Sequence, residues 1–178
     1  MMSELLRELI DASRVLRDPE AVAILANCGI DGSGPLFGLA TVETDERFYA
    51  PHPEGKLALI TGVWDDDGPL IDLVATSVRT RAMRRRRGDG QFIGGGAIER
   101  ARERGHALHL FTDGWSWMRH RRAGAVVLDW SAAPYEFDGL AEITCESEFL
   151  AARLKRAFAR PIAPPPISVP QQKEARHG

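Results

Sequence analysis

Hydrophobic residues near the N-terminus recur at helical spacing. Leu5 and Leu9 lie one helical turn apart behind Ser3, a residue type that commonly caps helix N-termini. Asp18 and Pro19 give a second start signal, because aspartate caps helices and proline is favoured in the first turn. We therefore expect two helices, the second one running through AVAILAN to a glycine.

Short apolar runs separated by turn residues come next. LFGLATV, RFYA and KLALITGVW, at residues 36–42, 47–50 and 56–64, are separated by ETDE and PHPEG. A run of aspartates followed by Gly68 then leads into LIDLVATSV at residues 70–78. Short strands joined by tight turns favour antiparallel pairing, so we expect a small antiparallel sheet in this half.

The second half alternates strand and helix patterns. Such alternation is typical of crossover units and a parallel sheet. The predicted fold class is therefore α/β, or α+β: N-terminal helices, a small antiparallel sheet, then alternating strands and helices. The expected strands are 107–111, 125–130 and 141–145, and the expected helices are 97–104, 114–122, 131–137 and 147–160.

The last of these helices has the clearest pattern. Ser147 is its expected cap, and an apolar stripe follows, made of Phe149, Leu150, Leu154, Ala157 and Phe158. Pro161 then ends the helix. The proline-rich segment that follows has few apolar residues to pack, so we expect one globular domain over residues 1–160 and a disordered tail over 161–178.

Composition is that of an ordinary globular protein, with 44% hydrophobic and 27% charged residues. The N-terminal segment lacks the pattern of a signal peptide, and no apolar run is long enough to cross a membrane. Two widely spaced cysteines, Cys28 and Cys145, suggest neither a disulfide framework nor a zinc module. We therefore expect a cytoplasmic protein without membrane contact.

Charge is distributed unevenly along the chain. Residues 79–122 hold twelve arginines and four acidic residues, a net charge of +8. The rest holds eleven basic and twenty-one acidic residues, a net charge of −10. A locally positive segment attracts phosphates or acidic proteins, so DNA, RNA and an acidic protein are the candidate partners, and a solvated loop is the alternative. The candidate nucleic-acid-binding residues are Arg79, Arg81, Arg84, Arg85, Arg86 and Arg87.

Three acidic residues follow the expected strands of the second half. Asp113, Asp129 and Glu146 each stand at or just past the carboxyl end of a strand, where ligands bind in open parallel sheets. Converging carboxylates could hold Mg²⁺ and support an enzyme that acts on a nucleotide or phosphate ester. The competing interpretation is that these residues cap or precede helices, which needs no metal.

Several stretches together carry a family resemblance. WDDDGPLIDLVATS, GAVVLDWSAAPYEFDGLAEITCESEFLAARL and FARPIAPPP resemble uncharacterised proteins encoded on bacterial prophages and plasmids, which accompany or resemble regions flanking primase-helicase genes. ITCESE is similar to the strand and glutamate that open a toprim domain, which would make Glu146 the catalytic glutamate. The later Asp-x-Asp pair of that fold is missing, so the resemblance implies a degenerate, non-catalytic relative.

Together, these patterns favour an accessory protein of a mobile element. We expect it to bind nucleic acid through the arginine segment, without catalytic activity and without a cofactor. A magnesium-dependent enzyme is the first alternative hypothesis. A structural or protein-binding domain, marked by an exposed apolar patch, is the second.

Overall fold

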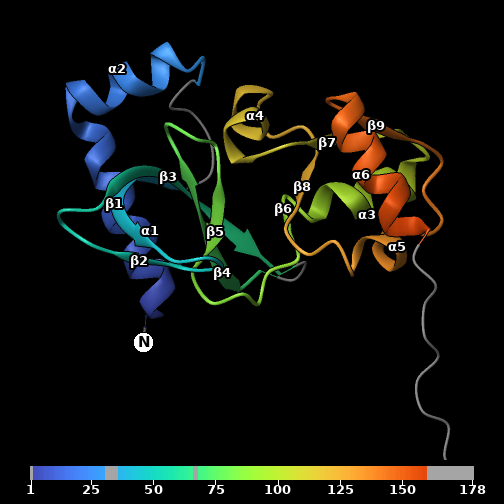
Figure 1. The fold of residues 1–178 in the computed structure, drawn as a ribbon, viewed down its shortest axis with the longest axis horizontal. Helices are drawn as coiled ribbons and strands as arrows, with labels where there is room; N and C mark the ends of the chain where they lie inside the picture. Colours follow the sequence, from blue (N-terminus) through green and yellow to red (C-terminus); the bar gives the residue numbers. More distant parts are fainter. Residues whose placement is uncertain (1, 31–35, 66–67, 160–178) are drawn as a thin grey trace, which may run out of the picture.

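The computed structural model describes residues 2–30, 36–65 and 68–159, so the expected tail at 161–178 lies outside the described residues. The chain forms an α/β mixed structure with N-terminal helices and two sheets, as the pattern predicts (Figure 1). The elements are α1 (Glu4–Arg14), the 3-10 helix η1 (Val15–Arg17), α2 (Pro19–Asn27), β1 (Phe37–Thr44), β2 (Tyr49–Pro51), β3 (Lys56–Trp64), β4 (Leu70–Ser77), β5 (Met83–Arg85), β6 (Phe92–Ile93), α3 (Gly96–Arg104), β7 (Leu108–Phe111), α4 (Gly114–Arg119), β8 (Ala125–Val127), α5 (Ala133–Glu136), β9 (Ile143–Cys145) and α6 (Glu148–Phe158).

The predicted caps of the N-terminal helices are confirmed. The Ser3 hydroxyl accepts a hydrogen bond from the Leu6 N–H, and the Asp18 carboxylate accepts one from the Glu20 N–H. These bonds satisfy donors that a helix start leaves without partners. Leu5 lies on the buried face of α1 and packs against the first sheet.

The first sheet is antiparallel, with the strand order β2-β1-β3-β4-β5. Its four predicted strands, β1 to β4, are confirmed to within a few residues. Strand β5 was not predicted, because it is three residues long and lies inside the arginine segment, where no alternation of apolar and polar residues marks it. The arginine segment is therefore an edge strand of the sheet rather than only a connection.

The second sheet has the order β6-β8-β7-β9. Strand β7 is parallel to both β8 and β9, which confirms the crossover units predicted from the alternation. The two-residue strand β6 adds an antiparallel edge that the sequence did not predict. The sheet is therefore mixed, and its parallel part brings the carboxyl ends of β7 and β9 to the same edge.

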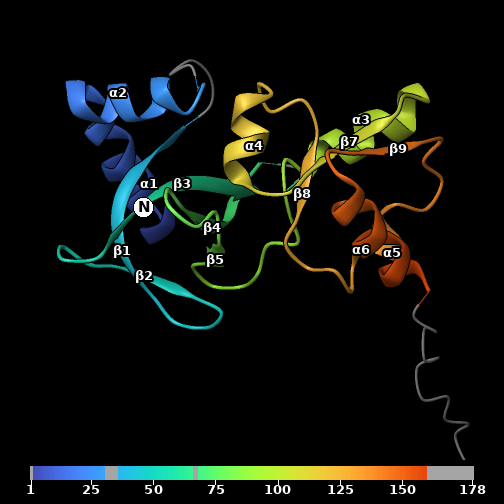
Figure 2. The ribbon, with the colours of Figure 1, turned by 45° about the horizontal axis from the view of Figure 1, so that its top comes forward.

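One hydrophobic cluster joins the two sheets. Leu59 and Val74 of the first sheet pack with Ile93 and Val126 of the second. Helix α4 stands between the two halves in both views and contributes the buried Trp115 to this cluster (Figures 1 and 2). A second cluster lies on the other face of the second sheet, beneath α3, α5 and α6. The two sheets are thus held together by a continuous apolar interior.

The stripe predicted on α6 is partly wrong. Leu150, Leu154 and Ala157 are buried, but the side chains of Phe149 and Phe158 are 66% and 47% exposed. Spacings of four and three residues place the buried side chains on one narrow face, and the two phenylalanines fall outside it. The Ser147 hydroxyl accepts from the Leu150 N–H, which confirms the predicted cap.

Two glycines permit close backbone packing. A Cβ at Gly38 would stand 2.1 Å from the Ala12 carbonyl carbon, so glycine lets α1 approach β1 closely. Gly94 follows β6 with φ 73°, and a Cβ there would stand 2.6 Å from the Gly124 oxygen. Gly94 therefore has a packing role in the connection between β6 and α3.

Among residues 2–30, 36–65 and 68–159, no helix combines the length and the apolar character needed to span a bilayer. Cys28 and Cys145 are both half-buried and not joined in a disulfide.

Candidate functional site

The end of the arginine segment is tied to helix α1. Arg86 donates from Nε to the Glu8 carboxylate at 2.9 Å, and the Tyr49 hydroxyl donates to the same carboxylate at 2.7 Å. Arg87 donates from Nη2 to Glu4 at 3.1 Å, and Arg86 also lies 3.5 Å from Glu4. Burial, reinforced by the Glu8 charge, raises the pKa of Tyr49 well above its usual value. These groups form an intramolecular arginine clamp, made of Glu4, Glu8, Tyr49, Arg86 and Arg87.

The loop after the clamp arginines is organised by Asp72 of β4. This carboxylate is fully buried and accepts backbone hydrogen bonds from Arg87 at 2.9 Å, Gly88 at 2.8 Å and Gly90 at 3.3 Å. Arg85 completes the turn by donating from Nη1 to the carbonyls of Gly88 and Gly90. A buried carboxylate is costly unless its oxygens are satisfied, and here backbone N–H groups satisfy it.

Arg81 is engaged with an aromatic ring. Its guanidinium carbon lies 4.8 Å from the ring centroid of Trp115, and its Nη1 is buried without a hydrogen bond among the described residues. The Trp115 indole N–H in turn donates to the Thr76 carbonyl at 3.1 Å. Arg81 therefore packs against the shared core and does not present its charge to a large ligand.

The remaining two arginines line a groove on the first sheet. Arg79 is exposed, and Arg84 is half-buried and held in place by hydrogen bonds from Nε to the Asp45 carbonyl and from Nη1 to the Met83 carbonyl. The groove has a volume of about 660 Å³. We call it the phosphate groove, because its cationic and hydroxyl side chains would suit a phosphate. It is lined by Lys56, Arg79, Arg84, Thr44, Ser77, Thr80, Val42, Leu57, Ala58, Ala75, Val78 and Ala82.

Strand register explains how these side chains meet. Lys56 pairs with Val42, and Arg84 pairs with Ala75, so each cation shares a face with its apolar partner. Val42 and Ala75 belong to the apolar cluster that α1 covers. The groove is therefore the part of this face that α1 leaves open, with an apolar floor and cationic walls.

The electrostatics of the phosphate groove favour anions. It is lined by three cations and three hydroxyl residues, and no acidic side chain lines it among the described residues. Asp45 stands nearby, and the backbone N–H groups of Phe48 and Arg47 hold its pKa below the usual value. That carboxylate is committed to its own turn, accepting both N–H groups at 2.6 and 2.7 Å.

The three carboxylates proposed for Mg²⁺ accept hydrogen bonds from protein groups, and one of them, Asp113, caps a helix. Asp113 accepts from the N–H groups of Trp115 and Ser116, which confirms the helix-cap interpretation. Asp129 accepts from the Ser131 N–H and hydroxyl, and these bonds lower the pKa of its carboxyl. The carboxylates of Asp113 and Asp129 thus accept hydrogen bonds from residues two or three positions along the chain, and these bonds explain their positions without a shared metal ion.

Glu146 is hydrogen-bonded to residues around the start of α4. Its carboxylate accepts from the Thr112 N–H at 2.8 Å and bonds the Ser116 side chain. Burial pushes the pKa of Glu146 upward, but these hydrogen bonds outweigh it, and the pKa lies below the usual value. Within the described ranges, no group of three or more histidine, cysteine or acidic residues is placed to hold a metal ion. The geometry therefore gives the magnesium hypothesis no support.

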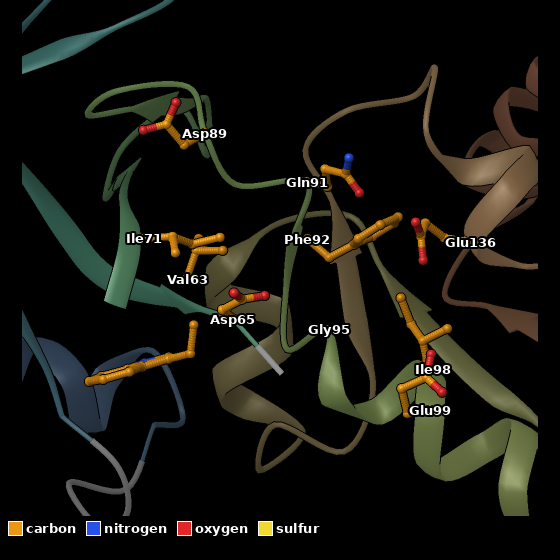
Figure 3. A pocket seen from close by; sticks show the side chains of 11 residues that line it. Val63, Asp65, Ile71, Asp89, Gln91, Phe92, Gly95, Ile98, Glu99 and Glu136 are labelled. Atoms are coloured by element: carbon orange, nitrogen blue, oxygen red, sulfur yellow. The ribbon is translucent and has the colours of Figure 1, made fainter. Parts of the chain in front are cut away.

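A cavity of the opposite charge lies between the sheets. It has a volume of about 320 Å³ and is lined by Asp65, Asp89, Glu99 and Glu136 among apolar side chains. In the view of Figure 3, Asp65 and Glu136 lie on opposite sides of the Phe92 ring. Carboxylates repel anions, so the lining of this cavity suits an anion less well than the lining of the groove on the first sheet does.

Comparisons of the chain with protein-family models, with curated proteins and with solved structures found no match.

Sequence reasoning found part of the basic surface and missed the rest. Arg79 and Arg84, two of the six candidate arginines, line the phosphate groove. Lys56 was missed, although it stands at the start of a correctly predicted strand. The signal that places Lys56 there is strand pairing, which a single sequence does not carry.

Proposed function

We propose that this protein binds nucleic acid through the phosphate groove, by contacts with the sugar-phosphate backbone. The carrying observation is the groove itself, where Lys56, Arg79 and Arg84 converge with hydroxyl groups on an open sheet face. Arginine and lysine neutralise phosphates, and hydroxyls donate to phosphate oxygens. Of the six candidate arginines, this proposal keeps Arg79 and Arg84 as phosphate-binding residues, and it adds Lys56.

The lining of the groove favours binding that is independent of base sequence. No aromatic residue and no amide side chain lines it among the described residues, so it offers neither stacking nor paired hydrogen bonds to base edges. Phosphate contacts alone give affinity without sequence preference and with strong salt dependence. We therefore expect little discrimination between sequences of equal length.

The proposed biological setting rests on the sequence resemblance alone. Similarity to prophage- and plasmid-encoded proteins that accompany primase-helicase genes supports a role beside nucleic acid. On this proposal the protein acts in the cytoplasm as a non-catalytic accessory of a mobile element. The resemblance supports the setting, and the groove supports the chemistry.

The test is a titration of labelled single- and double-stranded DNA and RNA across a salt series. The test variant replaces Lys56, Arg79 and Arg84 by alanine. The control variant removes the same charges from three exposed positions outside the groove, Arg7, Arg17 and Lys155. For duplex DNA, log K falls as log[salt] rises, and we expect the test variant to reduce the steepness of this fall by about 2 to 3 units of slope. The control variant should reduce it by less than about 1.

Replacing the whole segment Arg84–Arg87 would not be a clean test. Arg86 and Arg87 hold α1 through Glu8 and Glu4, so their loss disturbs the sheet that carries the groove. Circular dichroism and thermal unfolding should first show that the triple variant keeps its fold. Equal affinities and slopes for the folded test and control variants would refute the proposal, as would wild-type binding that is absent or indifferent to salt.

A further inference from the structure

A second basic cavity opens on the other sheet. It has a volume of about 550 Å³ and shares no lining residue with the phosphate groove. Four basic side chains and one acidic side chain contribute to it, so its charge balance is positive. The polar lining residues are His109, Arg119, His120, Arg121, Thr144 and Glu146.

The position of this cavity follows from the faces of the second sheet. Leu110 pairs with Cys145 on the face that packs beneath the helices α3, α5 and α6. His109 pairs with Thr144, which places both on the opposite face, and both are exposed. Strands β7 and β9 are parallel, and ligands in open α/β sheets bind near the carboxyl ends of such strands.

His120 is held in a defined orientation at the cavity. Its ring stacks on Phe111 with centroids 4.9 Å apart and an interplanar angle of 24°. Its Nδ1 lies 2.9 Å from the Ser116 carbonyl oxygen. Because a carbonyl only accepts, Nδ1 carries the hydrogen, and Nε2 is the ring nitrogen left for a ligand.

The two arginines are positioned by the chain around them. Arg119 donates from Nε to the Cys28 carbonyl at the end of α2, which anchors its guanidinium. Arg121 has φ 53°, in the left-handed region that disfavours side chains with a Cβ. In the described part of the chain, every non-glycine residue with positive φ is an arginine: Arg81, Arg121 and Arg122.

Arg121 lies in the left-handed turn that ends α4, where its N–H donates to the Met118 carbonyl and the Arg122 N–H donates to the Trp117 carbonyl. Glycine or asparagine would occupy the left-handed region with less strain, and a strained residue commonly marks a functional position. Arg121 is exposed and lines the cavity, so nothing in the core requires an arginine there. An arginine at this position adds a cationic side chain to the lining of the cavity.

We propose that this cavity binds a small phosphate-bearing anion, independently of the phosphate groove. Arg119 and Arg121 supply the guanidinium groups, and Thr144 supplies a hydroxyl donor. Glu146 also lines the cavity, and its carboxylate is hydrogen-bonded to Thr112 and Ser116. The volume lies in the range of ordinary small-molecule pockets.

The experiment is isothermal titration calorimetry of the full chain with pyrophosphate, beside thermal unfolding. Arg121→Gly removes the guanidinium and also relieves the strained backbone. We expect pyrophosphate to bind the variant about 10-fold more weakly, while its unfolding midpoint equals the wild-type value or exceeds it by about 2–4 °C. The exposed control Arg17→Ala should bind as the wild type does.

The groove variant separates this proposal from the proposed function. Replacement of Lys56, Arg79 and Arg84 by alanine should leave pyrophosphate affinity within about 2-fold of wild type, since none of them lines the cavity. The anion site would be overturned by an absence of saturable pyrophosphate binding, by full affinity in Arg121→Gly, or by a loss confined to the groove variant. A loss of nucleic-acid affinity in Arg121→Gly without pyrophosphate binding to the wild type would also overturn it.

Discussion

The arginine clamp and the phosphate groove use the same residue type for opposite purposes. In the clamp, Arg86 and Arg87 meet glutamates from α1, and their charges are neutralised within the fold. In the groove, Arg79 and Arg84 stand beside Lys56 with no acidic side chain in the described lining. Adjacent arginines in a sequence therefore differ in function according to what the other strands and helices bring to them.

The largest expected effect comes from breaking the support beneath the clamp. Asp72→Ala leaves the backbone N–H groups of Arg87, Gly88 and Gly90 without their acceptor in a buried loop. We expect the free energy of unfolding to fall by about 3 kcal/mol, measured by urea denaturation. The exposed Asp11→Ala should change it by less than about 1 kcal/mol, and a similar small change in Asp72→Ala would show that the loop does not depend on this carboxylate.

A smaller loss is expected when the clamp itself is cut. Glu8→Ala leaves the half-buried Arg86 and the buried Tyr49 hydroxyl without their shared acceptor. We expect a loss of about 2 kcal/mol in unfolding free energy. A double-mutant cycle with Arg86→Ala should give a coupling of about 1 kcal/mol or more. Additive effects of the two changes would mean that the ion pair contributes nothing.

The clamp should also be visible in the alkaline pH dependence of stability. The pKa of Tyr49 is raised in the folded protein, by burial first and then by Glu8, so only the unfolded chain ionises this tyrosine near pH 10. This contribution to stability is complete below the unfolded pKa and is lost progressively above it. The midpoint temperature of thermal unfolding should therefore fall more steeply above about pH 10 in the wild type than in Tyr49→Phe. Parallel curves would contradict this account.

The smallest effect is expected where clamp residues face water. Arg87 and Glu4 have side chains that are 46% and 66% exposed, so their ion pair is screened by solvent. Arg87→Ala should change the free energy of unfolding by no more than about 0.5 kcal/mol. A loss as large as that of Glu8→Ala would mean that Arg87, rather than Arg86, makes the main contribution of the clamp to the free energy of unfolding.

Much of the fold could be predicted because it is encoded locally. Ser3, Asp18 and Ser147 act as caps within three residues of their partners, and the strand β3 is mostly apolar. Strand β5 was missed because its sequence Met-Arg-Arg shows no run or alternation of apolar residues, and β6 because it has only two residues. Both strands are defined by the strands they pair with. The exposure of Phe149 on α6 was not predicted for a related reason, because the burial of a helix residue depends on what packs against that helix.

The candidate site was less predictable than the fold. The charge of residues 79–122 pointed to a basic surface, but the sequence did not tell that Glu8 neutralises Arg86 across 78 positions. Lys56 joins Arg84 only through the pairing of three strands. Charge is a local property of a sequence, while the partner of each charge is a property of the tertiary structure.

The long reach of the clamp has a consequence during synthesis. Leu5 and Leu9 pack against residues of β3 and β4, and Glu8 meets an arginine made 78 residues later. At translation speeds of about 5–20 residues per second, the apolar face of α1 stays uncovered for roughly 4–16 seconds before its sheet exists. The nascent chain therefore presents an amphipathic helix to the ribosome exit and to chaperones before the first sheet can close beneath it.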